Sequence, residues 1–438
     1  MVKLKRLKIL KFRNVAPGTE LRFRDSLNVL LGKNGTGKTT LLNLVVALLR
    51  WDFTPYLSEQ FSIEYDLQLP DGHIAVRLHN EPRYSLRKSA VADQAAPGGL
   101  IAGTMLRSNK SYETSGDITI TGAGLKSTHI AEFKNSQLTL KNTNETAGTH
   151  DYEKQIIDDT AVINIISAIY QLGILHNKDT ETITGIIASS HQNPFLLRFD
   201  ESLDYLGHIT MHESAFVTMK FPNGEHYAIA RLGGPSSVQQ EINRQLQLNQ
   251  NVDEIQIQSS DEDAEFLSKA VQLLGFMAAK IRIQRTAFIT EPTESIEFGN
   301  IRFDFTRRDR SIINHQLLSY GQKRLLAFYY YLACSPTAVV ADELVNGMHH
   351  EWIEACMDDL EGRQAFLTSQ NPLLLDYLHF ESVDEVLSSF VLCRTEPVGE
   401  REQLYWENMT QEDAQGFFDA YQVGIQHVSE ILHTRGLW

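Results

Sequence analysis

The sequence predicts an α/β fold built around a phosphate-binding loop, and three observations lead to this prediction. Residues 32–39 read GKNGTGKT, which fits the pattern G-x-x-x-x-G-K-[ST]. The apolar run Leu27–Leu31 precedes this loop, and the apolar helical run Thr39–Leu49 follows it. A third apolar run ends in the adjacent acids Asp342 and Glu343, as expected of a strand buried in a parallel sheet, where ligands bind at the carboxyl ends.

The composition is that of an ordinary globular chain of two or three domains, with 438 residues of which 42% are hydrophobic and 22% charged. No apolar run reaches roughly 18 residues, so we expect no transmembrane helix. The net charge of −15 argues against a uniformly basic nucleic-acid-binding protein but leaves a local basic surface open. Cys334, Cys356 and Cys393 lie far apart without metal-ligand spacing, so we expect small buried side chains in a reducing cytoplasm.

Residues 1–15 alternate basic and apolar side chains, which predicts a first strand rather than a signal peptide. The lysines of this strand suit a solvated sheet edge or, alternatively, a local basic surface. Residues 61–78, which turn at Pro70-Asp71-Gly72, and residues 216–229 each predict a hairpin. The stretch 80–150 is polar and dotted with glycine, so we expect irregular structure there.

Helical spacing of apolar residues covers residues 153–176, and residues 235–283 read as two helices. The second of these helices is expected to begin near Ser259, because the acids that follow would complement the positive end of its dipole. From about Thr286 to the C-terminus, strand and helix patterns alternate again.

The predicted loop has the chemistry of a phosphate site. Its glycines let backbone N–H groups approach phosphate oxygens without interference from Cβ atoms, and the helix beginning at Lys38 adds the positive end of its dipole. Lys38 can reach the β- and γ-phosphates, and the Thr39 hydroxyl is placed to bind Mg²⁺. The candidate nucleotide-binding residues of the loop are Asn34, Gly35, Thr36, Gly37, Lys38, Thr39 and Thr40.

Two further segments complete the predicted chemistry. Asp342 is expected to hold Mg²⁺ and Glu343 to orient and deprotonate the attacking water, although two acids after a strand also suit a helix N-cap. Ser319 and Gly321 precede an apolar helix, and a helix N-terminus with a hydroxyl and a glycine binds anions. A plain capped helix has the same sequence features.

Four motifs in order resemble those of ABC-type ATPases of the RecF, SMC and OLD-like branch. Residues 318–328, LSYGQKRLLAF, resemble the ABC signature, and residues 342–349, DELVNGMH, resemble a Walker B motif running into the D-loop. Residues 367–372, LTSQNP, are similar to the switch segment, with Gln370 where many relatives have histidine. Residues 7–15 resemble the first strand of the group.

The resemblance implies an ABC-type P-loop ATPase head, with a mixed sheet and helices, that is split by an inserted α+β region. We expect the N-terminal half of the head at residues 1–82 and the insertion at residues 83–285, with hairpins and helices but no long coiled coil. The C-terminal half, with the signature, the Walker B motif and C-terminal helices, is expected at residues 286–438.

The resemblance also implies that ATP joins subunits into a dimer or a higher homo-oligomer, and that hydrolysis loosens the contact. In such ATPases, the signature of one subunit closes on the γ-phosphate that another subunit binds. The implied cofactors are ATP and Mg²⁺. The implied roles are catalysis for Glu343, Lys38 and Gln370, nucleotide contact for Arg13, signature contacts in trans for Ser319, Gly321 and Gln322, the D-loop for Asn346 and Gly347, and Mg²⁺ binding for Thr39 and Asp342.

The insertion is too short for an SMC-type coiled coil, and the residues after Pro372 are too few for a TOPRIM domain, so we expect no nuclease in this chain. Compact ATPases of this organisation resemble those of bacterial anti-phage systems of the PARIS and the Septu or retron types. The resemblance implies a sensor or scaffold that regulates a separate effector, such as a TOPRIM or HNH nuclease, after a phage-derived trigger. A RecF-like DNA repair clamp is the alternative, and a transporter subunit is disfavoured by the insertion.

Overall fold

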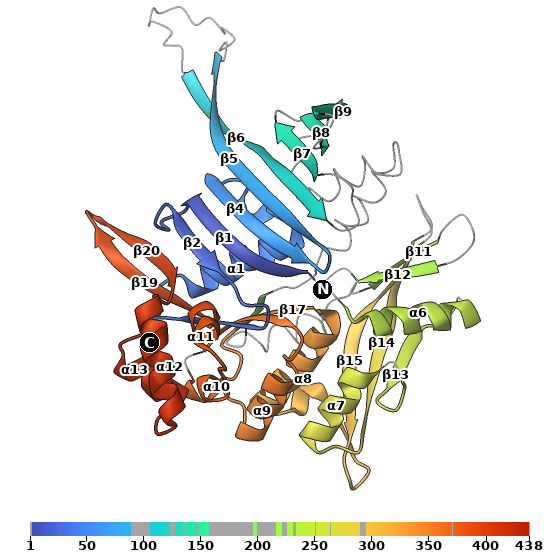
Figure 1. Ribbon diagram of the computed structural model, residues 1–438. Coiled ribbons are helices and arrows are strands. Elements are labelled where there is room, and N and C mark those ends of the chain that lie inside the picture. Colours follow the sequence, from blue (N-terminus) through green and yellow to red (C-terminus); the bar gives the residue numbers. More distant parts are fainter. Residues whose placement is uncertain are drawn as a thin grey trace, which may run out of the picture. The chain divides into compact units, whose positions relative to one another are not determined.

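The chain forms two compact units in the computed structural model (Figure 1). The first unit comprises residues 1–23, 47–191 and 394–407, and the second comprises residues 24–46, 192–393 and 408–438. Within these units, the structure describes residues 2–88, 106–122, 128–134, 137–144, 148–156, 196–198, 216–220, 226–230, 234–249, 251–262, 264–289, 295–335, 337–369 and 371–437.

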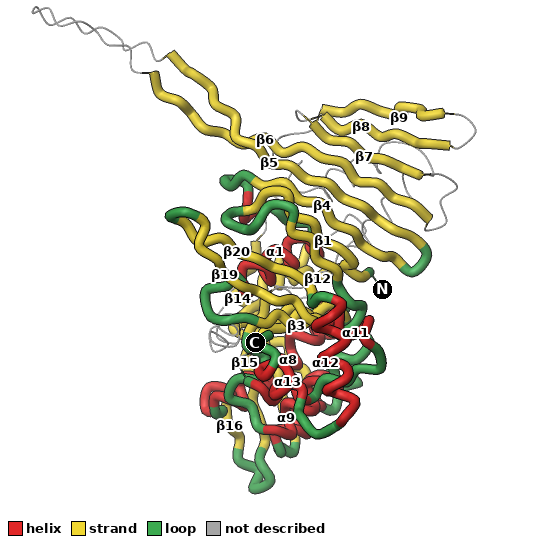
Figure 2. Tube along the Cα trace, turned by 60° about the vertical axis from the view of Figure 1, so that its left-hand side comes forward, coloured by secondary structure: helices red, strands yellow, loops and turns green. Residues whose placement is uncertain are grey.

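The first unit contains an eight-stranded antiparallel sheet, which Figure 2 shows as a wide fan of strands. The predicted hairpin at residues 61–78 is confirmed as β4 and β5, which turn between Leu69 and Gly72. In spatial order the strands are β2 (Thr19–Arg22), β1 (Lys3–Phe12), β4 (Phe61–Leu69), β5 (Gly72–Lys88), β6 (Leu106–Gly122), β7 (Thr128–Lys134), β8 (Gln137–Asn144) and β9 (Gly148–Ile156).

The first strand is not a sheet edge, which corrects one of the two interpretations of its lysines. Strand β1 lies between β2 and β4, and its apolar residues Leu4, Leu7, Ile9 and Phe12 are buried. Arg6 forms ion pairs with Glu20 on β2 and Asp66 on β4, at 2.9 and 3.3 Å. Arg6 therefore pairs with acids on both neighbouring strands, a favourable cross-strand arrangement.

The prediction of irregular structure over residues 80–150 is wrong for the described residues. Strands β5 and β6 pair without interruption from Gly72 with Gly122 to Lys88 with Leu106, and β7, β8 and β9 continue the sheet. Backbone pairing satisfies the N–H and C=O groups whatever the side chains are, so polar strands remain regular once a template strand is present. A few apolar residues on one face, such as Ile118 and Ile120, bury enough surface to fix the register.

The second unit is built on a parallel sheet in the order β10, β17, β18, β3 and β19. Because these strands are parallel, the carboxyl ends of β3, β17 and β18 meet at one edge. The strands are β10 (Leu196–Arg198), β17 (Ala338–Asp342), β18 (Gln364–Thr368), β3 (Leu27–Leu31) and β19 (Phe390–Val398), which continues into the first unit and pairs there with β20 (Arg401–Asn408).

Helices follow or flank these strands (Figure 1). The predicted helices after the phosphate loop and after Ser319 are confirmed as α1 and α8. The helices are α1 (Lys38–Arg50), α8 (Tyr320–Cys334), α9 (His350–Asp358), α10 (Pro372–Asp376), α11 (Val383–Ser389), α12 (Gln411–Val423) and α13 (Val428–Thr434), with a short 3₁₀ turn η1 (Thr54–Tyr56) after α1.

A third sheet, in the second unit, carries two helices on one side (Figure 1). It contains the predicted hairpin β11–β12, whose turn lies outside the described residues. The strands are β12 (His226–Ala230), β11 (Phe216–Lys220), β15 (Ser295–Thr306), β14 (Ala278–Ile289) and β13 (Glu254–Gln258), with β16 (Ile312–Asn314) paired to β15; the helices are α6 (Ser236–Leu248) and α7 (Glu265–Leu274), and a 3₁₀ turn η2 (His315–Leu317) follows β16.

The prediction for residues 235–283 needs a correction. A strand, β13, separates α6 from α7, and α7 begins at Glu265 rather than near Ser259. The carboxylate of Asp261 accepts a hydrogen bond of 2.7 Å from the backbone N–H of Gln258, so Asp261 stabilises a turn before the helix. The helix predicted at residues 153–176 lies outside the described residues, except for its first four residues, which belong to β9.

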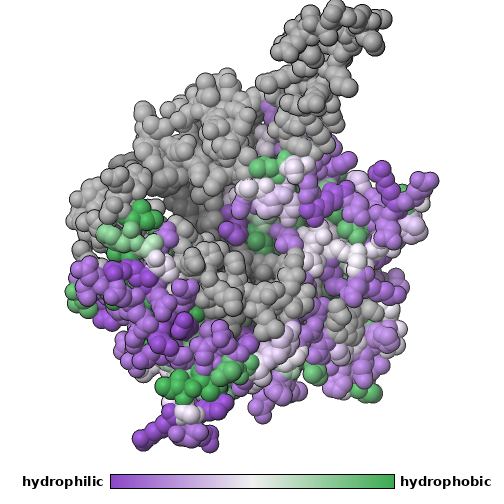
Figure 3. All heavy atoms as spheres, turned by 180° about the vertical axis from the view of Figure 1, so that it is seen from behind, coloured by the Kyte–Doolittle hydropathy of each residue, from purple (hydrophilic) through white to green (hydrophobic). Residues whose placement is uncertain are grey.

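The predicted α/β fold class is confirmed: the described part of the chain consists of sheets with flanking helices, and residues 32–37 connect β3 to α1. The three predicted segments differ from the two compact units and stay a prediction. In the described part of the chain, no helix is long and apolar enough to cross a membrane. Cys356 and Cys393 are buried and Cys334 is half-buried, as expected of small core side chains. On the face shown in Figure 3, the coloured surface is mostly hydrophilic with small apolar patches.

Candidate nucleotide-binding site

The predicted phosphate loop connects β3 to α1, as its sequence requires. Gly32 has φ +144°, and a Cβ there would lie 2.1 Å from the carbonyl oxygen of Cys393. Gly35 has φ +85° with no atom within 4 Å of an added Cβ, and Gly37 has φ +83°. The loop therefore needs glycine at all three positions for its backbone conformation and at Gly32 also for close packing, and it leaves open space beside Gly35.

The side chains of the loop are held by the loop itself. Lys38 is only 8% exposed, and its Nζ donates hydrogen bonds of 2.6 and 3.0 Å to the carbonyl oxygens of Gly32 and Lys33. The hydroxyl of Thr36 donates to the carbonyl oxygen of Lys33 at 2.8 Å. Burial raises the pKa of the Cys393 thiol to about 12, so the thiol beside the loop stays protonated. The ammonium group of Lys38 is thus held by carbonyl oxygens of the loop, and no carboxylate among the described residues pairs with it in competition with phosphate.

Asp342 joins the loop to the ends of two other strands. The Thr39 hydroxyl donates a hydrogen bond of 2.6 Å to Oδ2 of Asp342 at the end of β17. The Thr368 hydroxyl, at the end of β18, donates to Oδ1 of the same carboxylate. The backbone N–H of Glu343 donates to the Thr368 oxygen at 3.0 Å. The structure therefore brings together the predicted Mg²⁺ residues, Thr39 and Asp342, with the predicted catalytic acid.

Thr368 belongs to this site, although the sequence did not identify it as a candidate. It is buried, and it touches both acids of the site. The available signal was its position at the end of an apolar run in the segment that resembles the switch. Gln370 follows in that segment but lies outside the described residues.

We expect Thr368→Val to raise the Mg²⁺ concentration needed for half-maximal ATP hydrolysis. Valine keeps the shape of threonine but removes the donor to Asp342, which leaves a buried acceptor short of a partner at a cost of about 1–3 kcal/mol. Magnesium titrations of ATPase activity measure the shift, and Thr368→Ser, which keeps the hydroxyl, is the matched control. Equal Mg²⁺ dependence for valine and serine would show that the hydroxyl has no role there.

Glu343 adopts a backbone conformation that is unusual outside glycine. Its φ is +59°, its side chain is buried, and Oε2 accepts a hydrogen bond of 2.7 Å from Nδ2 of Asn346. Neither acid caps a helix, because α9 begins at His350 with His349 as its N-cap. Strained, buried carboxylates of this kind occur at functional sites, where the surrounding contacts hold them in place.

The predicted signature serine is the N-cap of α8. Its Oγ accepts from the backbone N–H of Gln322 at 3.4 Å, and Oε1 of Gln322 accepts from the backbone N–H of Ser319 at 2.9 Å, which completes a capping box. Ser319 itself is exposed, as are Leu317 and Tyr320, which are 73% and 42% exposed. The first turn of α8 therefore presents a polar cap with apolar neighbours to the surroundings.

Gly321 packs against the D-loop. A Cβ on this residue would lie 2.7 Å from the carbonyl oxygen of Gly347 and 3.1 Å from the ring of Trp352. Within the subunit, the backbone of the predicted D-loop therefore lies against Gly321 where any other residue would carry a side chain.

We expect Gly321→Ala to destabilise the protein by about 1–3 kcal/mol, because the added methyl overfills this contact. At an open helical position the same change would stabilise by about 1 kcal/mol. Urea unfolding measures the free energy of unfolding, and a gain in stability would show that the two segments are not in tight contact.

Arg13 lies in the first unit, where its own neighbours hold it. Its guanidinium forms two hydrogen bonds of 2.7 Å with the carboxylate of Glu59, and lies 5.3 and 5.5 Å from the ring centres of Phe12 and Tyr56. The ion pair with Glu59 raises the pKa of Arg13 further. Its predicted contact with nucleotide stays a prediction.

The described residues fit a Mg²⁺ nucleoside triphosphate. No cluster of three or more His, Cys, Asp and Glu side chains suited to a metal occurs in the described part of the chain. Mg²⁺ commonly binds one or two carboxylates together with phosphates and water, which is the set that Asp342, Thr39 and a triphosphate would supply. The open space beside Gly35 and the cation of Lys38 accommodate that triphosphate.

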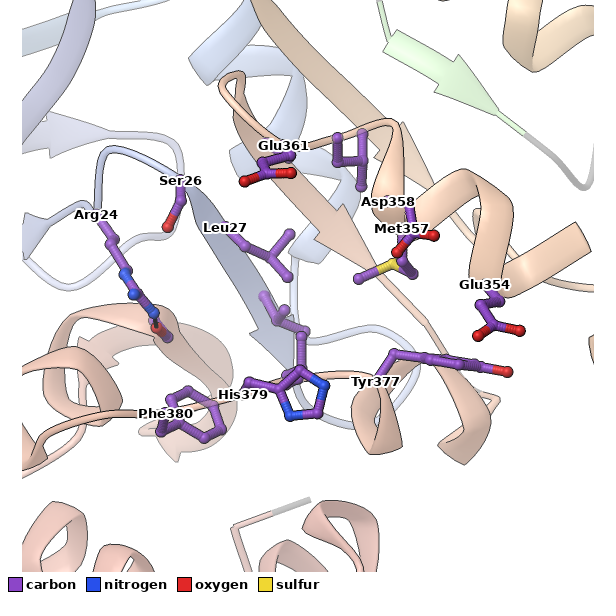
Figure 4. Close-up of a pocket in the computed structure, with 15 residues that line it drawn as sticks. Arg24, Ser26, Leu27, Glu354, Met357, Asp358, Glu361, Tyr377, His379 and Phe380 are labelled. Carbon is purple, nitrogen blue, oxygen red and sulfur yellow. Dashed lines mark hydrogen bonds between the residues drawn. The ribbon is translucent and has the colours of Figure 1, made fainter. Parts of the chain in front are cut away.

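A separate cavity of about 370 Å³ lies near the amino-terminal end of β3, away from the phosphate loop at its carboxyl end (Figure 4). Glu354, Asp358 and Glu361 line it, and Arg24 on its wall is paired with Glu385 at 2.5 Å. Three carboxylates disfavour a triphosphate, so this cavity is not the nucleotide site.

Comparisons with known proteins agree with an ATPase but cover the chain unevenly. Residues 163–376, just under half of the chain, match the family model described as "AAA domain, putative AbiEii toxin, Type IV TA system". A comparison with curated proteins returns no match.

Solved structures align with most of the chain at low similarity. The SMC head domain from Thermotoga maritima gives a TM-score of 0.34 at 10% identity over 92% of this chain and 98% of that chain. The Smc head domain with an extended coiled coil bound to the C-terminal domain of ScpA, from Pyrococcus furiosus, gives 0.34 at 8% identity over 96% and 100%. The recombination mediator protein RecF-ATPrS gives a TM-score of 0.28 at 13% identity over 84% of this chain and 93% of that chain. TM-scores this low do not support an inference about function.

The family match is therefore the informative comparison. It is to an AAA-type ATPase domain, and the matched stretch carries Ser319, Asp342 and Glu343. The phosphate loop precedes this stretch in sequence but lies in the same compact unit as Ser319, Asp342 and Glu343.

Proposed function

We propose that this protein is an ABC-type ATPase that binds and hydrolyses ATP with Mg²⁺. The observation that carries the proposal is the chain of hydrogen bonds from Thr39 through Asp342 and Thr368 to Glu343. It joins the phosphate loop, the candidate Mg²⁺ ligands and the candidate base in one buried cluster. Three segments far apart in sequence meet there, which a structural N-cap does not require.

Each residue has a role in this proposal. The backbone N–H groups of residues 34–40 bind phosphate oxygens, and Lys38 neutralises the β- and γ-phosphates. Thr39 and Asp342 hold Mg²⁺, which stabilises developing charge on the phosphates when bound. Glu343 orients the attacking water and accepts its proton. The proposed roles of Gln370 towards the γ-phosphate and of Arg13 towards the nucleotide rest on the sequence resemblance alone.

We further propose that nucleotide joins subunits into a dimer or a higher homo-oligomer. The exposed cap of α8 supports this, because Ser319, Gly321 and Gln322 lie at a helix N-terminus suited to an anion and are flanked by the exposed apolar residues Leu317 and Tyr320. Light scattering tests it: the mass of the protein should rise with Mg²⁺ and ATP and stay at the monomer value for Lys38→Ala. An unchanged wild-type mass with ATP bound would contradict it.

At the cellular level, we propose a cytoplasmic sensor or scaffold in anti-phage defence that regulates a separate effector such as a TOPRIM or HNH nuclease. The sequence resemblance supports this role, and the description of the matched family names a toxin of a toxin–antitoxin system. The test is co-purification with a co-encoded effector and phage challenge of cells that carry Lys38→Ala. If the protein binds no co-encoded effector and Lys38→Ala does not change phage sensitivity, the role is ruled out.

A RecF-like DNA clamp is the alternative, and one surface favours it. The turn between β15 and β16 exposes Arg307, Arg308 and Arg310, which suit a phosphate backbone. ATP-dependent DNA binding that weakens steeply with salt would favour the clamp over the defence role.

A further inference from the structure

We propose that Arg324 is a positioning residue that ties the signature helix to the carboxylate of Glu343 within one subunit. The inference rests on the proposed ATPase activity and adds a mechanism of control to it. Arg324 lies one turn into α8 and is only 2% exposed, so it contacts neither solvent nor a second subunit directly.

The guanidinium of Arg324 connects two segments. Nη1 donates a hydrogen bond to the backbone carbonyl oxygen of Asn346, and Nη2 donates to the hydroxyl of Tyr320. The guanidinium carbon lies 4.3 Å from the ring centre of Tyr320. A planar fork that stacks on a ring while it donates at two ends is a geometry that arginine provides and lysine does not.

Asn346 carries the connection to the acid. Its Nδ2 donates to Oε2 of Glu343 at 2.7 Å, and its backbone N–H donates to the carbonyl oxygen of Glu343 at 3.4 Å. Arg324 thus holds the backbone of the residue whose side chain holds the candidate base. A shift of that backbone would re-aim the carboxylate of Glu343.

A second contact makes the connection stiff. The carbonyl oxygen of Gly347 lies 2.7 Å from a Cβ placed on Gly321, and the ring of Tyr320 lies 3.2 Å from a Cβ placed on Gly347. The first turn of α8 and the D-loop are therefore interlocked by packing as well as by hydrogen bonds. They move together, because interlocked backbone segments without spare volume cannot slide independently.

Tyr320 links these contacts to the exposed surface of the subunit. One part of its side chain contacts Arg324 and Gly347, yet the residue is 42% exposed beside Ser319. A subunit that docks on the signature through its bound nucleotide would contact Tyr320 and displace or fix Arg324. Glu343 of a subunit would then reach its working position only when the signature of that same subunit is engaged. Hydrolysis is thereby coupled to assembly.

The test compares Arg324→Met, which fills a similar volume without donors, with Arg324→Lys, which keeps the charge without the fork. We expect kcat to fall on the order of tenfold or more in both, with the Kd for ATP within about twofold of the wild type, because the phosphate loop is untouched. A merely structural role would lower the thermal midpoint and weaken ATP binding together.

A double variant separates positioning from general damage. If Arg324 acts through Glu343, then Arg324→Met should add almost no loss to the single-turnover rate of Glu343→Gln, whereas independent effects would multiply. Tyr320→Phe, which removes one acceptor and keeps the ring, should give a smaller loss of the same kind and serves if Arg324→Met does not fold.

Different results would contradict the proposal for Arg324 and the proposal of ATPase activity. Unchanged kcat in the arginine variants, or multiplicative loss in the double variant, overturns the inference while the ATPase proposal stands. A wild-type protein without ATP hydrolysis overturns the ATPase proposal itself.

Discussion

Replacing Glu343 with glutamine is expected to lower kcat for ATP hydrolysis by about 10²- to 10⁴-fold, the contribution of a positioned general base. Glutamine keeps the size of the side chain and one oxygen, so the contact with Asn346 can persist. Only the ability to accept the proton of the attacking water is lost. ATP binding should be unchanged, because the carboxylate of Glu343 does not contribute to the phosphate loop.

Phosphate release at saturating ATP measures this effect, and nucleotide binding is measured in parallel. Glu361→Gln, at an exposed acid of the same unit, is the matched control and should leave both quantities unchanged. If Glu343→Gln retains more than about a tenth of the wild-type rate, general-base catalysis by this residue is contradicted. We also expect the glutamine variant to accumulate the nucleotide-bound oligomer, because the step that loosens the contact is slowed.

Replacing Lys38 with alanine should weaken ATP binding by about 10²-fold, which corresponds to the loss of one or two charge-assisted hydrogen bonds. The present contacts of the ammonium group are with two loop carbonyl oxygens, so the cation is already fixed where the phosphates would bind. Its removal also takes away the charge that offsets the triphosphate. Hydrolysis should be undetectable at ordinary ATP concentrations.

Titration with a fluorescent ATP analogue measures the change in Kd, and a thermal shift with Mg²⁺ and ATP gives an independent measure, since ligand binding to the folded state raises its stability. Lys33→Ala is the matched control, because Lys33 is exposed in the same loop and contributes only its backbone carbonyl to the contacts of Lys38. Equal affinity in the Lys38 and Lys33 variants would contradict the predicted phosphate site.

The phosphate site could be predicted from sequence because its determinants are local. Gly32 and Gly35 adopt backbone conformations that follow from a loop between a strand and a helix, and the capping box of Ser319 and Gln322 lies within four residues. Where the geometry is set within one turn, residue type and spacing are enough.

Contacts between distant segments could not be predicted in the same way. The hydroxyl of Thr368 meets Asp342 only because β18 lies next to β17 in the sheet, and no spacing encodes that order. The partner of Gly321 is Gly347, which the local sequence does not reveal. Strand β1 likewise reads as a lysine-rich edge until β2 is placed beside it. Pairing order, rather than propensity, is the missing information.

The long polar strands of the first unit could not be predicted from their own sequence either. Residues 106–122 carry many Ser, Thr, Asn and Gly residues that suggest loops when taken alone. In the sheet, β5 provides a template along their whole length, and Ile118 and Ile120 fix which face is buried. Strand formation there depends on the neighbour more than on the residues themselves.

The central claim is that Ser319 and Gly321 of one copy complete the nucleotide site that Lys38 of another copy begins. Mixing Lys38→Ala protein with Ser319→Arg protein tests it most directly, because each variant alone has no complete site. If the site is shared between subunits, the mixture contains pairs with one intact phosphate loop and one intact signature facing each other, and Mg²⁺ and ATP raise the mass of the mixture to that of a dimer, which neither variant forms alone. If the mass of the mixture stays at the monomer value although ATP is bound, the shared site is contradicted.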